Sequence, residues 1–329
     1  MIDLLIHGRT FDRVVDALQP FRARIRPLVV RDGEITAAWG PTAENPVQPE
    51  IVFGNTDVYF GDAASRDTFI QTVLETKKLR WFQSSATGTD RALLKTFGRQ
   101  AEIYTNAHGQ AVAIAEYVLW QTLDFLRAGP ERRANAEARA WRRLSARELS
   151  GLNWLIFGFG EIGRETAKRV RLLGGYVVGV RRTPGPDPDA DQIIGPGGLH
   201  AALPAADVVL LCAPLTSETQ NIADAAFFSN MREDALLINV GRGALVVESD
   251  LIAALDAGRP AFAALDVVAQ EPAAPDNPLW AHPKVNLTAH DSPATRGSKQ
   301  RNDQTFLDNL KRYLDGEPLQ NIVPKSDLE

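Results

Sequence analysis

Three residues in the last third of the sequence could together bind and protonate an acidic substrate. Arg242, Glu271 and His290 each follow an apolar run, in the phrases Leu-Ile-Asn-Val-Gly-Arg, Leu-Asp-Val-Val-Ala-Gln-Glu and Val-Asn-Leu-Thr-Ala-His. A guanidinium group is a planar fork that fits a carboxylate, and histidine changes its charge near neutral pH. A carboxylate beside a histidine favours the charged imidazole, which can donate a proton. We therefore interpret the three residues as one catalytic site.

A glycine-rich phrase upstream predicts a cofactor site for these residues. The phrase consists of Gly158, Phe159, Gly160, Glu161, Ile162 and Gly163. Three glycines at this spacing arise easily by chance, and an ordinary glycine turn is the alternative. The context favours a cofactor, because a strand is predicted over 154–157 and an amphipathic helix after the turn ends at Gly174-Gly175. In such a unit, backbone N–H groups at the helix N-terminus hold a pyrophosphate.

The residues after the next predicted strand, 176–180, indicate which dinucleotide is bound. A site selective for NAD(H) usually carries an acidic residue there, whereas this chain has Arg181, Arg182 and Thr183. Guanidinium and hydroxyl groups can bind a 2′-phosphate that a carboxylate would repel. The sequence therefore predicts a preference for NADP(H), with NAD(H) as a possible substitute. The alternative is that both arginines point to solvent.

Strand-like and helix-like segments alternate along the chain in two blocks, which is typical of parallel sheets covered by helices on both faces. The strands expected in the first block are 2–6, 26–30, 34–38, 51–53 and 79–83, with a helix over 11–18 and a hairpin at Asp32-Gly33. The second block has a long helix over 111–127 that ends at Gly129-Pro130, a helix-like arm to about 148, and strands at 154–157, 176–180, 208–211, 236–240, 263–267 and 285–288. Ligands of such sheets bind beyond the carboxyl ends of the strands, where Arg242, Glu271 and His290 all lie.

Length and composition exclude several classes of protein. The 329 residues exceed the size at which a single core usually splits, so we expect two domains. Hydrophobic residues make up 44% and charged residues 23%, which argues against a disordered, collagen-like or coiled-coil chain. A net charge of −5 gives no electrostatic reason to bind nucleic acid or a membrane surface.

Local features favour a cytoplasmic protein. The N-terminus lacks the pattern of a signal peptide, no apolar run reaches the length of a membrane span, and Cys212 is expected to be a buried thiol. We assign no metal ligands. Several arginines of the arm alternate with acids, which predicts a solvated helix face or a subunit contact; they are Arg132, Arg133, Arg139, Arg142 and Arg143.

Taken in order, the motifs resemble those of the D-2-hydroxyacid dehydrogenase family, and within it the NADP-preferring branch of glyoxylate/hydroxypyruvate reductases. The matching phrases are the glycine turn, Pro214-Leu-Thr216-Ser-Glu-Thr219, Asn239-Val240-Gly241-Arg242-Gly243, Leu265-Asp266 to Glu271-Pro272, Pro278-Leu-Trp280 and Thr288-Ala-His290. The resemblance extends from about Gln83 to Asn309 and the residues after it. Two departures are Arg181 in place of the usual acid and Ala289 in place of a common proline.

The resemblance implies an α/β protein of two doubly wound parallel-sheet domains. Residues 1–108 and 297–329 would form a flavodoxin-like substrate domain, and residues 109–296 a Rossmann dinucleotide-binding domain. It also implies an enzyme that reduces a 2-oxo acid to the D-2-hydroxy acid with a nicotinamide cofactor. Like the helical arm, it suggests a homodimer.

The resemblance implies a role for each site residue. Arg242 would bind the substrate carboxylate and polarise the neighbouring carbonyl, His290 would protonate the carbonyl oxygen, and Glu271 would keep His290 charged and oriented. Asp266 would hold the nicotinamide carboxamide. Four more residues fall at cofactor positions, namely Pro214, Thr219, Val240 and Gly241.

Substrate contacts from the first domain are expected where its strands end. Asn55, Thr87 and Gly88 lie there and could meet a carboxylate, with an ordinary turn as the alternative. Trp141 and Trp280 could line the pocket or a subunit interface, or be packed in the core.

Two other functions remain open at this point. A formate dehydrogenase shares the architecture, but the resemblance there implies an amide in place of Glu271. A non-catalytic protein that senses NAD(P)H, similar to the corepressors among the relatives, would keep the same fold. The side chain of the substrate is also open, because glyoxylate, hydroxypyruvate, pyruvate and bulkier 2-oxo acids share one anchor.

Overall fold

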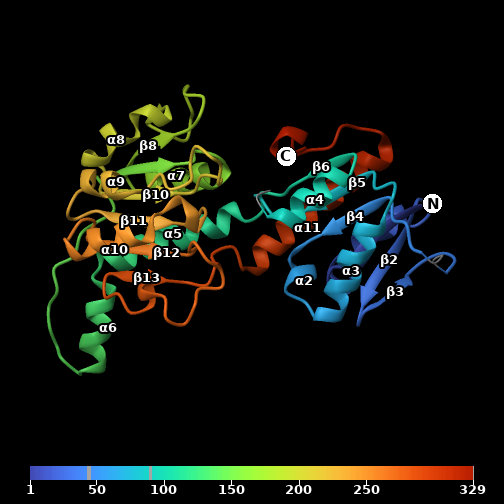
Figure 1. Cartoon of the computed structure of the whole chain (residues 1–329), viewed down its shortest axis with the longest axis horizontal. Helices are drawn as coiled ribbons and strands as arrows, with labels where there is room; N and C mark the ends of the chain where they lie inside the picture. Colours follow the sequence, from blue (N-terminus) through green and yellow to red (C-terminus); the bar gives the residue numbers. More distant parts are fainter. Residues whose placement is uncertain (43–45, 89–90, 329) are drawn as a thin grey trace. The chain divides into compact units, whose positions relative to one another are not determined.

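The computed structural model of the protein describes residues 1–42, 46–88 and 91–328. The chain divides into two compact units, shown in Figure 1. Unit 1 comprises Met1–Gln110 and Arg296–Glu329, and unit 2 comprises Ala111–Thr295. None of the helices in the described part of the chain has both the length and the apolar character that crossing a membrane requires.

Unit 1 is built on a mainly parallel sheet whose strand order is β3-β2-β1-β4-β5-β6. Its elements are β1 (Ile2–His7), α1 (Gly8–Leu18), β2 (Ile25–Arg31), β3 (Glu34–Ala37), β4 (Ile51–Gly54), α2 (Thr56–Tyr59), α3 (Ala63–Glu75), β5 (Trp81–Ser84), α4 (Ala92–Gln100), β6 (Ile103–Thr105) and α11 (Arg296–Asp315). The predicted hairpin is confirmed: β2 and β3 pair antiparallel, and Asp32 and Gly33 both have positive φ angles, of 49° and 82°. The other strand pairs are parallel.

The C-terminal helix α11 completes the core of unit 1. Figure 1 shows this red helix among the blue elements of the N-terminal segment. Phe306 of α11 stacks on Phe53 of β4 with ring centroids 4.2 Å apart, and lies 5.7 Å from the ring of Trp81 in β5. All three side chains are fully buried. The two ends of the chain therefore fold as one unit because aromatic side chains from both fill the same core.

Unit 2 contains a parallel sheet in the order β13-β12-β11-β10-β7-β8-β9. Its elements are α5 (Ala111–Leu126), α6 (Gly129–Glu137), β7 (Asn153–Phe157), α7 (Glu161–Leu172), β8 (Tyr176–Val180), β9 (Gln192–Ile194), α8 (Leu199–Ala202), β10 (Val208–Leu211), α9 (Ala225–Asn230), β11 (Leu236–Asn239), α10 (Glu248–Asp256), β12 (Phe262–Leu265) and β13 (Val285–Leu287). The central strands β10 and β11 are buried throughout, which explains their continuous apolar sequences. The predicted class, two parallel α/β sheets with a Rossmann-type order in unit 2, is confirmed.

The helical part of the arm after α5 is shorter than the sequence predicted. Helix α5 ends at Leu126 before Gly129-Pro130, as expected, but α6 ends at Glu137 rather than near 148. Arg139 adopts a left-handed φ of 52°, and the N–H of Ala140 donates to the carbonyl of Asn135 over 2.8 Å. This is the hydrogen-bond pattern of a Schellman cap, which ends a helix.

The side chains of this arm are mostly exposed. Trp141 is fully exposed, so the expectation of buried packing at this position is wrong. Arg133 forms two hydrogen bonds with the carboxylate of Asp124 on α5, of 2.7 and 2.9 Å, and both side chains contact solvent. Figure 1 shows α6 projecting beyond the sheet of unit 2.

Candidate active site

The glycine phrase forms the turn between β7 and α7, and its three glycines lie in different structural surroundings. Gly158 has a φ of +99°, and a Cβ atom there would lie 2.3 Å from the backbone nitrogen of Ala213. A Cβ atom on Gly163 would lie 2.9 Å from the carbonyl oxygen of Gly158, so this glycine lets the helix approach the turn. Around Gly160, by contrast, no heavy atom lies within 4 Å of the Cβ position. The backbone of Gly160 is therefore open to the close approach of a ligand.

The N-terminus of α7 is suited to an anion. Gly160 is its N-cap and provides no side-chain hydrogen bond to the first turn, so backbone N–H groups there are not capped by their own N-cap residue. Phe159 is buried in the core of unit 2, so it can meet a cofactor only through its backbone, whereas Ile162 packs against the same core and is partly exposed. Glu161 is half exposed and pairs with Arg164 over 3.5 Å.

Cys212 supports this turn from the neighbouring strand end. Its thiol donates a hydrogen bond to the carbonyl of Gly158 over 3.2 Å. Burial raises the pKa of the Cys212 thiol to about 12, so it remains protonated. The residue as a whole is half-buried, and the expected burial holds for its sulfur atom.

The selectivity loop after β8 differs from the expectation at Arg181. The guanidinium group of Arg181 pairs with Asp187 over 3.0 Å and donates to the carbonyl of Gly185 over 2.9 Å, so it folds back onto its own loop. Arg164 of α7 also binds Asp187, over 3.0 Å. Burial alone would raise the pKa of Asp187, but the N–H of Asp189 and the guanidinium of Arg164 lower it. Sequence reasoning missed Asp187, which lies six residues beyond the arginine.

The neighbouring residues Arg182 and Thr183 are arranged differently. Both are exposed beyond the carboxyl end of β8. Arg181 therefore shapes the loop, while Arg182 and Thr183 present the side chains that solvent or a ligand can reach.

The predicted cofactor residues after β10 and β11 form two ordered turns. Thr219 donates through its hydroxyl to the carbonyl of Pro214 over 2.7 Å, and accepts the N–H of Thr216 over 2.8 Å. Val240 is buried, and its N–H donates to the carbonyl of Leu211 in β10. Gly241 is also buried, next to Val240. These contacts fix the loops that flank the glycine turn.

Arg242 stands on a turn that Asn239 organises. The side chain of Asn239 accepts the N–H of Gly241 over 3.0 Å and donates to the carbonyl of Arg242 over 2.9 Å. A Cβ atom on Gly243 would lie 1.8 Å from the carbonyl carbon of Val268, so only glycine lets the turn pack against that backbone. The guanidinium of Arg242 donates to the carbonyl of Gly241 over 2.8 Å. The role of Asn239 was not anticipated, although its place at a strand end before Gly-Arg-Gly is a usable signal.

His290 and Glu271 form a direct pair. The Nδ1 atom of His290 lies 2.7 Å from Oε2 of Glu271, and about a third of each side chain is exposed (30% and 33%). The two residues follow β13 and β12, which are neighbours in the sheet. The pair therefore leaves Nε2 as the second ring nitrogen, able to donate a proton to a substrate when the imidazole is charged.

Asp266, directly after β12, is buried and holds the segment that carries His290. Its Oδ1 atom accepts the hydroxyl of Thr288 over 2.7 Å, the N–H of Asp291 over 3.0 Å and the N–H of Ser292 over 3.2 Å. Its backbone carbonyl accepts the N–H of His290 over 2.8 Å. Sequence reasoning gave Thr288 and Ser292 no role.

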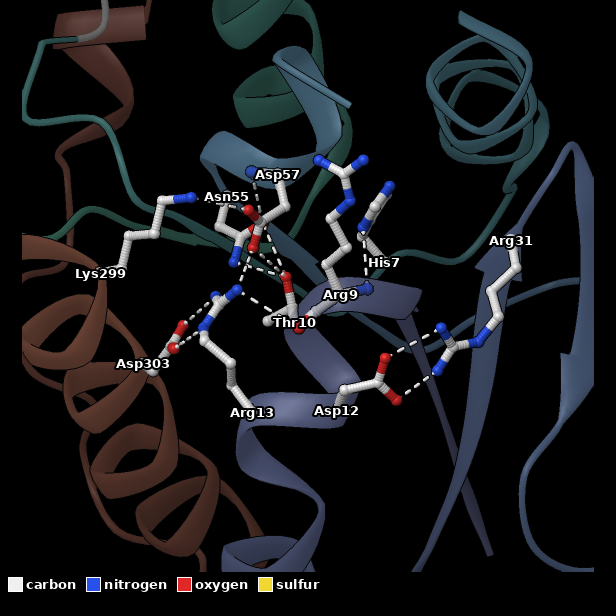
Figure 2. Close-up of polar contacts among 10 residues, drawn as sticks. All are labelled: His7, Arg9, Thr10, Asp12, Arg13, Arg31, Asn55, Asp57, Lys299 and Asp303. Atoms are coloured by element: carbon white, nitrogen blue, oxygen red, sulfur yellow. Dashed lines mark hydrogen bonds and ion pairs between the residues drawn. The ribbon is translucent and has the colours of Figure 1, made fainter. Parts of the chain in front are cut away.

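Asn55 was expected to contact the substrate. In the structure its side chain is buried in a polar cluster of unit 1. Figure 2 shows the Asn55 amide turned toward Thr10 and Asp57. Asn55 accepts the N–H of Asp57 over 3.2 Å, as the N-cap of α2, and its amide donates to the hydroxyl of Thr10 over 2.7 Å. Asp57 in turn binds Arg13 and Lys299. Because only 2% of Asn55 is exposed, a ligand could meet this position through the backbone alone.

Thr87 and Gly88 lie after β5 in the same unit. The Thr87 hydroxyl donates to the carbonyl of Ala107 over 3.0 Å, and its carbonyl accepts the amide of Asn106 over 2.9 Å. Gly88 is half-buried. Trp280 is 48% exposed in unit 2 and donates to the carbonyl of Ala274, so it is not a core residue.

Comparison with known proteins identifies the family. The family model described as D-isomer specific 2-hydroxyacid dehydrogenase, NAD binding domain, matches residues 119–292. The glyoxylate/hydroxypyruvate reductase A of Salmonella newport is 30% identical over 222 residues, which cover 66% of this chain and 69% of that protein. The chain belongs to the D-isomer specific 2-hydroxyacid dehydrogenase family. The resemblance seen in the motifs is thereby confirmed.

Other members of the dehydrogenase family match over different lengths. The hydroxypyruvate reductase of Blautia hydrogenotrophica is 35% identical over 180 residues, so the chain spans about half (55%) of that relative and the match covers 54% of this chain. A D-isomer specific 2-hydroxyacid dehydrogenase family protein from Aeromonas salmonicida has a solved structure with a TM-score of 0.79 and 28% identity, covering 98% of this chain and 99% of that one. The NADPH-dependent glyoxylate/hydroxypyruvate reductase of Sinorhizobium meliloti, solved without ligand, matches 56% of this chain and 94% of its own chain at 30% identity and a TM-score of 0.54.

Proposed function

We propose that the protein reduces a small 2-oxo acid to the D-2-hydroxy acid, with NADPH as the preferred cofactor. The observation that carries the proposal is the pair of His290 and Glu271 at 2.7 Å, beyond the carboxyl edge of the same sheet that carries the glycine turn. A charged histidine beside a carboxylate suits a reaction in which a carbonyl oxygen must gain a proton.

The residues of the glycine turn fit a dinucleotide. The open space at Gly160 and the uncapped N-terminus of α7 can accept a pyrophosphate, and Gly158 provides the tight turn before them. When bound, the nicotinamide cofactor supplies the hydride that reduces the carbonyl carbon. Asp266, to which the family resemblance assigns the nicotinamide carboxamide, follows β12 at the same sheet edge, and its carboxylate is buried and bonded to the His290 turn.

Each catalytic residue then has one task. Arg242 binds the substrate carboxylate through its guanidinium fork and withdraws electron density from the adjacent carbonyl. His290 donates the proton on Nε2 to the carbonyl oxygen. Glu271 accepts the hydrogen bond from Nδ1, which fixes the ring and favours its charged form.

The preference for NADPH rests on the loop after β8. Arg182 and Thr183 are exposed at the position where an acidic residue would exclude a 2′-phosphate, and Arg181 stiffens the loop through Asp187. The name of the Sinorhizobium meliloti relative, an NADPH-dependent reductase, supports the same choice. NADH is expected to serve less well.

We further propose that unit 1 is the substrate domain. Its residues Thr87 and Gly88, together with the backbone at Asn55, follow strands β5 and β4 at their carboxyl ends. Glyoxylate and hydroxypyruvate are the first substrates to test, because relatives at 30 to 35% identity carry those names.

A panel of 2-oxo acids assayed with NADPH and with NADH tests the proposal. The expected result is cofactor oxidation with glyoxylate or hydroxypyruvate and a higher kcat/KM for NADPH than for NADH. Cofactor binding without turnover of any 2-oxo acid would contradict the enzymatic proposal and favour a sensing protein. Turnover with a preference for NADH would contradict only the assignment of Arg182 and Thr183.

A further inference from the structure

A line of hydrogen bonds runs from helix α5 to the turn that carries His290. The hydroxyl oxygen of Tyr117 in α5 lies 2.8 Å from the hydroxyl oxygen of Thr288, and Thr288 donates to Oδ1 of Asp266 over 2.7 Å. A hydroxyl group has one proton to donate. Because Thr288 donates its proton to the Asp266 carboxylate, Tyr117 must be the donor in the contact with Thr288.

We propose that Tyr117, Thr288 and Asp266 are positioning residues that fix the turn of His290 and so control proton donation to the substrate. The inference rests on the proposed function. It adds residues that lie behind the catalytic pair and do not touch the reacting atoms.

The backbone conformation of His290 explains why these three positioning residues are needed. His290 has a φ of +53°, a left-handed conformation that residues other than glycine seldom adopt. Asp266 holds the chain on both sides of this strained residue, at the hydroxyl of Thr288 before it and at the N–H groups of Asp291 and Ser292 after it. The backbone carbonyl of Asp266 holds the N–H of His290 itself. A carboxylate that accepts several hydrogen bonds from one turn fixes that turn more firmly than neutral acceptors would.

Tyr117 is suited to anchor the series of hydrogen bonds that continues through Thr288 to Asp266. It is 8% exposed, and its ring packs in the core of unit 2 with Trp154 and Ile156 among others. Burial raises the pKa of Tyr117, the nearby charges of Asp266 and Asp291 act in the same direction, and the hydrogen bond with Thr288 opposes them. The phenol therefore stays protonated near neutral pH and can donate this hydrogen bond.

The consequence concerns the alignment of His290 with Glu271. These two side chains come from different loops, and a shift of the His290 turn would lengthen the 2.7 Å contact between them. Without that contact the imidazole loses the partner that holds its orientation toward the substrate. Removing Tyr117 or Thr288 from this series of hydrogen bonds should therefore lower kcat and leave KM for NADPH little changed.

The experiment compares Thr288→Val and Tyr117→Phe with the wild type in the reduction of glyoxylate by NADPH. We expect kcat to fall about 10-fold in each, a part of the 10²- to 10⁴-fold that general acid catalysis supplies. KM for NADPH should change little, so the effect should appear in kcat. Thr288→Ser keeps the hydroxyl and should restore the wild-type kcat.

The matched control is Asn286→Ala. Asn286 lies two residues before Thr288 and donates to Gln121 of helix α5 over 2.8 Å, outside the series of bonds that joins Tyr117, Thr288 and Asp266. This variant should lose stability without a change in kcat. Tyr117→Phe deletes a single oxygen atom from a packed ring, so it carries the test even if Thr288→Val does not fold.

The outcomes separate this inference from the proposed function. If the wild type reduces glyoxylate and both variants keep its kcat, the positioning role is wrong and the proposed function stands. If the wild type turns over no 2-oxo acid, the proposed function fails. Hydrogen exchange then tests the positioning role without turnover. The backbone amides of residues 288–292 should exchange faster in Tyr117→Phe than in Asn286→Ala. Equal exchange rates would contradict the positioning role.

Discussion

Nδ1 of His290 lies 2.7 Å from a carboxylate oxygen of Glu271, and the two side chains reach each other from loops that follow adjacent strands of one sheet. Both side chains are about one third exposed. This arrangement keeps one ring nitrogen engaged with the protein while the ring remains accessible. A site of this kind can donate a proton to a ligand and then take up another proton from solvent.

Replacing Glu271 with glutamine should separate the charge from the hydrogen bond. Glu271→Gln keeps the shape of the side chain but removes the negative charge beside the imidazole. We expect kcat for 2-oxo acid reduction to fall, with KM for NADPH unchanged. Asp276→Asn, an exposed acid in the same loop, should change neither. The account of Glu271 would fail if its variant kept the wild-type kcat.

Replacing Arg242 with lysine should weaken substrate binding and leave cofactor binding intact. Lysine keeps the positive charge but loses the fork that bonds both carboxylate oxygens. The KM for glyoxylate should rise about 10- to 100-fold, which corresponds to the loss of about 1.5–3 kcal/mol for a charge-assisted hydrogen bond. Steady-state kinetics with each substrate varied in turn provide the measurement, and an unchanged KM for glyoxylate would remove Arg242 from the carboxylate site.

Cofactor selectivity should depend on Arg182 more than on its neighbours. Arg182→Gln should lower kcat/KM for NADPH about 10-fold or more, since a charged hydrogen bond to the 2′-phosphate is lost, and should leave the value for NADH unchanged. Arg232→Gln is a suitable control, because Arg232 is also an exposed arginine and precedes β11 at the opposite edge of the sheet. Equal effects on NADPH and NADH would show that Arg182 does not read the 2′-phosphate.

The glycine turn, the places of Arg242, Glu271 and His290 after strands, and most strands could be predicted because their signals are local. The turn and Arg242 depend on residues that are close in sequence, such as Asn239 and Gly243. The three-residue strands β6 and β9 were missed, and in β9 no residue is buried, so its sequence carries little apolar pattern.

Contacts between distant residues could not be predicted in the same way. Tyr117 and Thr288 are 171 residues apart, and neither a tyrosine nor a threonine indicates by its type which residue it will hydrogen-bond to. Arg181 was assigned to the cofactor from its position after β8, but the carboxylate of Asp187 competes for it. The side chain of Asn55 was assigned to substrate and caps α2 instead. In each case the chemistry of the residue was known from the sequence, whereas its partner depended on the fold.

The polar contacts around Asp57 in Figure 2 should make unit 1 sensitive to acid. Burial alone would raise the pKa of Asp57, but hydrogen bonds from Arg13 and Lys299 lower it below the ordinary value. A carboxyl group whose pKa is lowered on folding stabilises the protein above its unfolded pKa of about 4, and this contribution is lost as the pH falls through the lower, folded value.

Asp57→Asn should therefore cost most near pH 7, about 1.5–3 kcal/mol for the loss of charge-assisted hydrogen bonds to partly exposed partners, and progressively less below pH 4. Denaturant unfolding at several pH values measures the difference. Asp12→Asn removes the exposed pair with Arg31 and should have little effect. A cost of Asp57→Asn that is the same at pH 3 and pH 7 would show that the ionised form of Asp57 adds no stability.

The most direct test of the central claim is the rate of NADPH oxidation with glyoxylate or hydroxypyruvate by the wild-type protein and by His290→Ala. The account predicts measurable turnover by the wild type and a fall in kcat of about 10²- to 10⁴-fold in the variant, the contribution expected of a general acid. Cofactor binding should survive the substitution. Full activity of His290→Ala would contradict the assignment of His290 as the proton donor.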